Sequence, residues 1–139
     1  MKTKIILLSI FGFGMPALAQ SLTPGVWKAQ TSFKLNGIPL PPSDSEECVS
    51  KESAKDVKAT ISKELKKKGC ELTKWKLKGE KLEAALTCQS DDLNAKGKIT
   101  GKVTSKKYAL NGEAEGTYKN MIPSSATLTL NGQWDKPCQ

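Results

Sequence analysis

The feature that most constrains the fold is a two-residue alternation of apolar or small residues with polar residues over two consecutive stretches, 93–103 and 108–118, interrupted only at Ala109. Successive side chains of a β-strand point to opposite faces, so this alternation predicts two strands that each bury one face. Only a short segment around Ser105-Lys106 separates them, which favours an antiparallel hairpin.

The two predicted strands also specify their own register. With the loop at Ser105-Lys106, a large inward residue mostly faces a small one, and on the other face lysines lie opposite glutamates. The predicted partners are Val103 with Tyr108, Gly101 with Leu110, Ile99 with Gly112, Ala95 with Gly116, Leu93 with Tyr118, Lys98 with Glu113, and Lys96 with Glu115. Two independent patterns therefore agree on one register.

Four inward glycines in this hairpin need a reason, because glycine offers a strand no side chain to pack. Either the sheet is strongly coiled, or something packs close against its backbone. An amphipathic helix would satisfy the second condition, and a small apolar, lipid-like ligand is the alternative. The candidate ligand face consists of Gly97, Ile99, Gly101, Leu110, Gly112 and Gly116.

The helix is expected at about residues 53–68. Ser53 has the side chain of an N-cap, and Asp56 stands at the capping-box position. One face of this segment is apolar at helical spacing. It carries Ala54, Val57, Ile61 and Leu65. Three lysines, 66–68, fall in the last turn, where the helix dipole favours cations, and Gly69 suits the position after the helix.

Strands are also expected at 26–35, at 44–49 and at 126–135, with a turn at Asn36-Gly37. A further hairpin is predicted from segments 70–78 and 81–89. The predicted fold class is therefore α+β: a strongly coiled antiparallel β-sheet of six or seven strands, with one amphipathic helix packed on it.

Four cysteines, Cys48, Cys70, Cys88 and Cys138, predict two disulfides in an exported chain. Gly79-Glu80 is a two-residue hairpin loop between two of them. A one-residue bulge near Thr73-Lys74 would bring Cys70 opposite Cys88, within disulfide reach. Cys48 would then bond Cys138 by elimination, so that the sheet is stapled twice.

Residues 1–19 have the features of a signal peptide. Two lysines precede a short apolar core, and Ala17-Leu18-Ala19 forms an A-x-A cleavage site. The apolar run is too short to span a membrane, so no transmembrane anchor is expected. We therefore expect cleavage near Ala19, a periplasmic or secreted location, and a single antiparallel β-rich domain over residues 20–139.

The charged residues exclude several kinds of chemistry. The 22 basic residues are all Lys, with no Arg and no His, and the formal net charge is +8. There is therefore no Ser-His-Asp or Cys-His catalytic unit, no imidazole metal site and no arginine contact to guanine. Neither nucleic acid nor a cofactor is expected, because the lysines fall on solvated faces or opposite glutamates. Weak contact of the Lys-rich surface with anionic envelope components stays open.

Carboxylates are the remaining catalytic candidates. Glu46 and Glu47 are adjacent, so on a strand they point to opposite faces. Asp91 and Asp92 with Asn94 supply too few oxygen ligands for a calcium loop, and a polar turn explains them equally well. We expect no enzyme activity and no metal site. A hydrolase that relies on carboxylates alone is kept as an alternative.

The chain also resembles a known family of small exported bacterial proteins, the domain-of-unknown-function 3617 family. The resemblance rests on Pro24-Gly25-Val26-Trp27 after the signal peptide, Pro41-Pro42 ahead of Cys48, Thr87-Cys88 closing a hairpin, and the terminal Cys138. It implies export, a β-rich fold and paired cysteines, but no activity. We expect a non-enzymatic binding or structural domain of the cell envelope, or alternatively a carrier of small apolar ligands.

Overall fold

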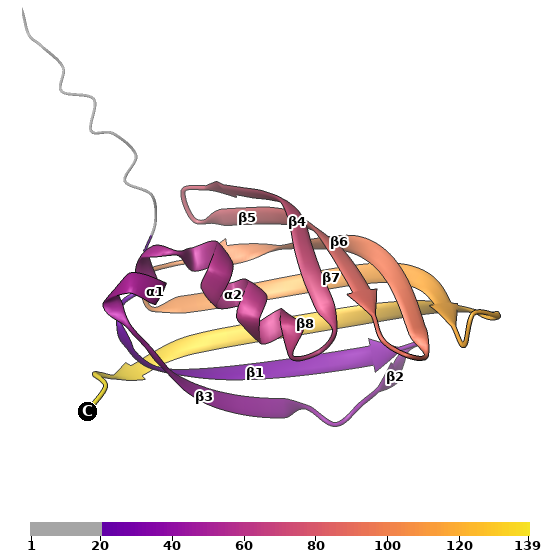
Figure 1. Ribbon diagram of the computed structural model, residues 1–139, viewed down its shortest axis with the longest axis horizontal. Helices are drawn as coiled ribbons and strands as arrows, with labels where there is room; N and C mark the ends of the chain where they lie inside the picture. The colour runs from indigo at the N-terminus through magenta and orange to yellow at the C-terminus, as the bar shows by residue number, and fades with distance from the viewer. Residues whose placement is uncertain (1–20) are drawn as a thin grey trace, which may run out of the picture.

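The computed structural model describes residues 21–139, so the predicted signal peptide lies outside the described residues. The chain forms one antiparallel sheet and two short helices (Figure 1). In chain order the elements are β1 (Gly25–Leu35), β2 (Ile38–Pro39), β3 (Ser43–Val49), α1 (Lys51–Lys55), α2 (Val57–Lys66), β4 (Cys70–Lys78), β5 (Lys81–Gln89), β6 (Leu93–Val103), β7 (Lys107–Tyr118) and β8 (Ile122–Lys136). The predicted α+β class is confirmed, with eight strands rather than six or seven.

The strands follow the order β2-β1-β8-β7-β6-β5-β4, and β3 also pairs with β1. Strands β4 to β8 form a meander of sequence neighbours, and β8 then returns beside β1. The sheet is not closed, so β4 forms one edge, and β3 and β2 form the other. The β4 edge carries a bulge and several lysines, which protect an exposed strand from pairing with another chain.

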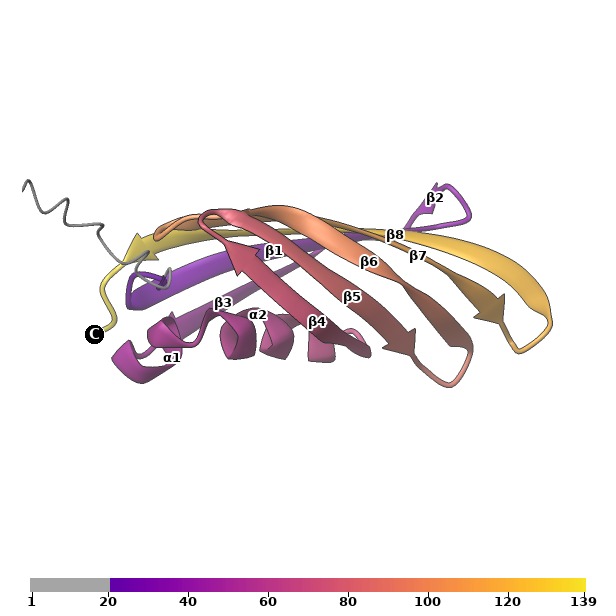
Figure 2. The same ribbon diagram turned by 90° about the horizontal axis from the view of Figure 1, so that it is seen from above.

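The sheet is strongly curved, and both helices lie on its concave side (Figure 2). They cover only part of that side, because β7 and β8 continue well beyond the C-terminal end of α2. The core lies between α2 and the sheet, where Ile61 and Leu65 are fully buried beside Leu110. The concave side therefore has a covered part and an uncovered part.

The predicted register of β6 and β7 is confirmed at every pair. Val103 faces Tyr108, Leu93 faces Tyr118, and the five pairs between them are as expected. The bulge in β4 is also confirmed, since the register shifts between Thr73 and Lys76. Lys74 takes the extra position with a φ of 51°. The inward side chains of β4 then change face as the disulfide requires.

Both predicted disulfides are present. Cys70 lies opposite Cys88 with their Cα atoms 4.0 Å apart, and Cys48 bonds Cys138 with a Cα separation of 5.8 Å. The second disulfide joins the C-terminus to β3, which also pairs with β1. Because Cys48 and Cys138 are 90 residues apart in sequence, this bond closes a long loop that contains every element from α1 to β8 and leaves β1 and β2 outside it.

The helical region differs from the prediction because it is broken at Asp56. The apolar face from Ala54 to Leu65 is buried as expected, but Ser53 lies inside α1 and is not an N-cap. The side chain of Ser50 caps α1, and the side chain of Asp56 accepts a hydrogen bond from the Ala59 amide to cap α2. Asp56 leaves the helical conformation, with a φ of −106°, and this separates the two helices.

The last strand begins at Ile122, earlier than the predicted residue 126. The segment from Ile122 to Ser125 contains a proline and two serines, which favour a loop locally. In the structure this segment pairs with the end of β7, where Tyr118 faces Ile122. Tertiary pairing therefore overrides the local preference of these residues.

Candidate functional site

The six residues of the predicted ligand face differ in burial. Ile99, Leu110 and Gly112 are buried in the core with the apolar residues of α2. Gly97, Gly101 and Gly116 are only half-buried. The candidate residues thus lie on one side of the sheet, but they do not form one continuous exposed surface.

Close approach of neighbouring strands explains why several of these positions are glycine. A Cβ atom added to Gly97 would overlap the backbone carbonyl of Glu113, and one added to Gly116 would overlap that of Asn94. These atoms belong to the neighbouring strand, so the coiling of the sheet itself requires glycine here. Gly112 differs, because an added Cβ would meet the flexible end of Leu86 at 3.1 Å.

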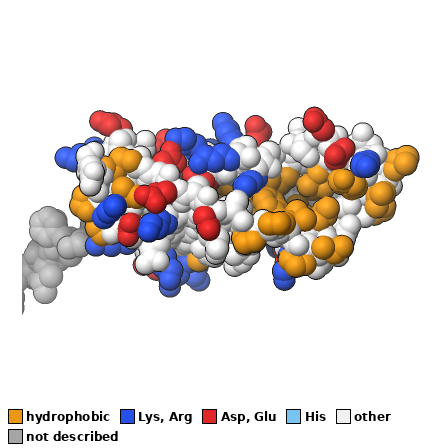
Figure 3. All heavy atoms as spheres, turned by 90° about the horizontal axis from the view of Figure 1, so that it is seen from below, with side chains coloured by type: hydrophobic (Ala, Val, Ile, Leu, Met, Phe, Trp, Pro, Cys, Tyr) orange, Lys and Arg blue, Asp and Glu red, His pale blue; other side chains and the backbone are white. Residues whose placement is uncertain are grey.

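The uncovered part of the concave side is mostly apolar, with Ser124 as a buried polar residue opposite Gly116. Its side chains come from β1, β6, β7 and β8, and the strand register places them on the same side as the core. We call this surface the open face; it consists of Phe33, Leu35, Leu93, Gly116, Tyr118 and Ala126, all half-buried. Figure 3 shows hydrophobic side chains gathered at this end of the molecule. Leu35 lies directly opposite Ala126, which joins β1 to β8 across the open face.

Exposed hydrophobic residues lie at the same end of the sheet as the open face, although β2 projects from the side opposite to the helices (Figure 2). Ile38 is 66% exposed and Met121 is 82% exposed, and Leu40 and Ile122 are also exposed. Ile38 lies in β2 and Leu40 follows it, whereas Met121 lies between β7 and β8 and Ile122 begins β8. Asn36 links the turn between β1 and β2 to the start of β8. Its backbone amide donates a hydrogen bond to the backbone carbonyl of Ser125 over 2.8 Å. The exposed large apolar side chains of residues 21–139 are thus concentrated at one end.

Polar contacts fasten α2 to β3 at the other border of the open face. Lys63 donates a hydrogen bond to Glu47, and Ser45 donates one to Glu64 over 3.0 Å. Lys67 pairs with Glu64, with 2.9 Å between Nζ and Oε1. Glu64 is almost completely buried but hydrogen-bonded on both sides, which satisfies a carboxylate that would otherwise be costly to bury.

Electrostatic effects favour the charged form of Glu47 and the neutral form of Tyr108. The hydrogen bond from Lys63 lowers the pKa of Glu47, against a smaller opposing effect of burial. Burial raises the pKa of Tyr108, and the negative charges of Glu64 and Glu47 raise it further. Tyr108 stacks on Trp27 with ring centroids 5.7 Å apart, so its ring belongs to the core.

The structure separates the predicted carboxylate candidates. Glu47 points toward α2, whereas Glu46 lies on the outer side of the sheet. Asp92 and Asn94 are engaged in loop contacts, with the Lys119 amide donating to the Asp92 carbonyl and Asn94 donating to Asn120. Within residues 21–139, no group of three or more Asp, Glu or Cys residues is arranged to hold a metal ion.

Two features of the site were not found from the sequence. Glu47 and Glu64 come together from different elements, and the only local signal is a glutamate beside the apolar stripe of α2. The second feature is a polar hollow of roughly 570 Å³ on the outer side of β1 and β8. Its lining includes Lys28, Gln30, Asp44, Glu46, Lys107 and Gln133. Opposite charges and amides line this hollow.

The outer side of the sheet carries many of the lysines. Lys96 and Lys98 face Glu115 and Glu113 in register, as predicted. Among the described residues, the ion pairs on this side of the sheet involve other lysines. They join Lys28 to Asp135 and Lys102 to Glu80. None of the helices within residues 21–139 is long and apolar enough to cross a membrane.

Comparison with known proteins gives one match. A family model described as "Protein of unknown function (DUF3617)" matches residues 22–138, which is nearly the whole described chain. No curated protein and no solved structure matches the chain significantly.

Proposed function

The chain belongs to the DUF3617 family of proteins of unknown function, and we propose that it is an exported binding protein that holds the acyl chain of a lipid-like ligand on the open face. The predicted signal peptide and the two disulfides support export, because disulfides persist in oxidising compartments. The ligand would lie on the concave side, beside the part that α2 already fills.

The carrying observation is that α2 covers the concave side only in part. Along β8 and β1 the core under α2 continues into the open face, since Leu128 is buried and its partner Phe33 is half-buried. Contiguous exposed apolar surface of this kind marks a binding site in a folded protein. An acyl chain suits it because each buried methylene group contributes about 0.8 kcal/mol.

A role in binding without catalysis agrees with the charged residues near the open face. Glu47 and Glu64 are carboxylates of the border between α2 and β3, and each has a lysine partner. A general acid needs a raised pKa, whereas the pKa of Glu47 is lowered by Lys63. We therefore propose a carrier rather than a carboxylate-based hydrolase.

The test compares two substitutions on the same strand. Ala126→Glu places a charge on the open face, whereas the matched control Thr127→Glu places the same charge on the outer side of β8. Binding of a fluorescent fatty acid would be measured by titration, and folding of both variants would be checked by circular dichroism and thermal unfolding.

We expect Ala126→Glu to weaken binding at least about tenfold, because a charge on an apolar contact surface costs 1.4 kcal/mol or more. Thr127→Glu should bind like the unaltered protein. If both folded variants bound the fatty acid equally well, or if the unaltered protein did not bind it, the open face would not be an acyl-chain site.

A further inference from the structure

The open face begins where α2 ends. Lys63 contacts Glu47, and one residue later Glu64 contacts Ser45, which comes earlier in β3. Moving forward along α2 therefore means moving backward along β3. Because Ser45 pairs with Ala29 and β3 and β1 are antiparallel, the next turn of α2 reaches about the level of Thr31 on β1, one inward position before Phe33.

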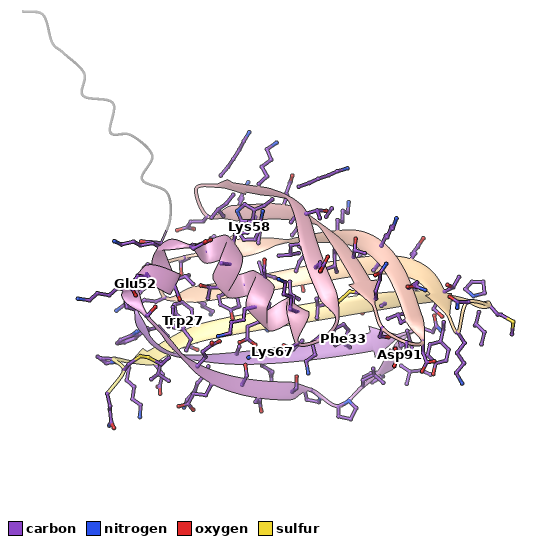
Figure 4. The ribbon with its side chains drawn as sticks, viewed as in Figure 1. Trp27, Phe33, Glu52, Lys58, Lys67 and Asp91 are labelled. Carbon is purple, nitrogen blue, oxygen red and sulfur yellow. A yellow bond between two sulfur atoms is a disulfide. The ribbon has the colours of Figure 1, made fainter. Side chains whose placement is uncertain are left out.

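Two lysines, Lys67 and Lys68, occupy that level. Both are exposed, and Figure 4 shows Lys67 and Phe33 near the C-terminal end of α2, one from the helical segment and one from β1. Lys67 is paired with Glu64, whereas the ion pairs among residues 21–139 leave Lys68 without an acidic partner. Positive charge thus borders the apolar surface at one end.

We propose that the ligand of the open face is a monomeric anionic amphiphile, whose anionic head group lies beside Lys67 and Lys68. This inference rests on the proposed function, because it assumes that the apolar chain occupies the open face. From the lysines the chain would run over Phe33 and Leu35 toward Ile122, away from α2. The ammonium groups supply point charges that suit a carboxylate or phosphate head group.

The helix dipole also favours lysines at the end of a helix, with or without a ligand. The two roles make different predictions. A lysine that only balances the dipole affects the stability of the fold, but it does not affect the choice between a charged and an uncharged ligand of equal chain length. A lysine that contacts a head group affects that choice.

The experiment measures binding of dodecanoate and of 1-dodecanol, which share one chain length, at concentrations below micelle formation. The variant is Lys67→Gln combined with Lys68→Gln, since the amide of glutamine can still donate a hydrogen bond to Glu64. The matched control is Lys58→Gln, which removes an exposed lysine from the first turn of the same helix (Figure 4).

We expect the double variant to bind dodecanoate roughly three- to tenfold more weakly, as for the loss of exposed ion pairs, and to bind dodecanol unchanged. Lys58→Gln should leave both affinities unchanged. Added salt should weaken the binding of dodecanoate only.

Several results would overturn the inference. Suppose that the unaltered protein binds dodecanol. If the double variant then binds dodecanoate as tightly as the unaltered protein, or loses affinity for both ligands equally, the head-group contact is wrong and the proposed function stands. Binding of neither ligand to the unaltered protein would remove both proposals. Binding to anionic vesicles without binding of either monomer would assign the surface to a membrane instead.

Discussion

Lys63 of α2 donates a hydrogen bond to Glu47 of β3, and this contact lowers the pKa of the glutamate. Both residues belong to the cluster that fastens α2 to the sheet edge. The contact therefore helps to fix how far α2 extends over the concave side, and with it where the open face begins.

The first prediction concerns this contact and pH. The pKa of Glu47 in the folded protein lies below its ordinary value of 4.5, so the ionised form stabilises the fold. Glu47→Gln should lower the stability at pH 7. The difference from the unaltered protein should shrink as the pH falls below 4.5 and through the lower pKa of the folded state. Urea unfolding at pH 7, 4 and 3 measures it; a difference that is independent of pH would contradict the account.

The second prediction concerns the disulfides. Cys70 and Cys88 are 18 residues apart, and Cys48 and Cys138 are 90 residues apart. Closure of the longer loop restricts the unfolded chain more. Paired Cys→Ala replacement should cost about 3 kcal/mol for the first disulfide and about 4–5 kcal/mol for the second. Urea unfolding compares the variants, and a larger loss for the Cys70–Cys88 replacement would contradict the order.

The third prediction separates two inward glycines. Gly97→Ala would force a Cβ onto the backbone of β7 and should cost about 3 kcal/mol, near the upper end for overpacking. Gly112→Ala meets only side-chain atoms, those of Leu86 at 3.1 Å and of Leu128 at 3.4 Å, and should cost about 1 kcal/mol. Thermal unfolding of both variants tests this. Equal losses would mean that strand approach does not explain the glycine at 97.

The fourth prediction concerns the break between the helices. Asp56→Ala removes the N-cap of α2 and should cost about 1 kcal/mol. Ser53→Ala removes a side chain that caps neither helix, so its effect should be within about 0.5 kcal/mol. Denaturant unfolding at neutral pH distinguishes them, and a reversed order would restore Ser53 as the cap that its sequence context predicts.

The sheet could be predicted where its signals are local. The register of β6 and β7 follows from alternation and a short loop, and the β4 bulge follows from the need to place Cys70 opposite Cys88. The break at Asp56 was not predicted, because Ser53 followed three residues later by Asp56 has the pattern of a capping box. That pattern places one helix start at Ser53, whereas in the structure Asp56 is itself the N-cap of α2. The early start of β8 was not predicted, because Pro123 locally favours a loop. Only the pairing of Pro123 with Thr117 in the assembled sheet makes it part of a strand.

The candidate site depends on relationships that no local pattern contains. The sequence predicts that the glycine-rich face and the apolar side of the helix meet, but not how far α2 extends over the sheet. That extent is fixed by contacts such as the one between Ser45 and Glu64, which are 19 residues apart. The open face is what remains beyond the end of α2, so it could be identified only from the assembled structure.

The central claim is that an acyl chain lies on the open face, and paramagnetic NMR locates it most directly. A fatty acid that carries a nitroxide on its chain would be added to isotopically labelled protein. The account predicts broadened amide signals from Leu35, Gly116 and Ala126, with the signals of Lys28 and Gln133 on the outer side unchanged. Broadening confined to the outer polar hollow, or no broadening at all, would contradict it.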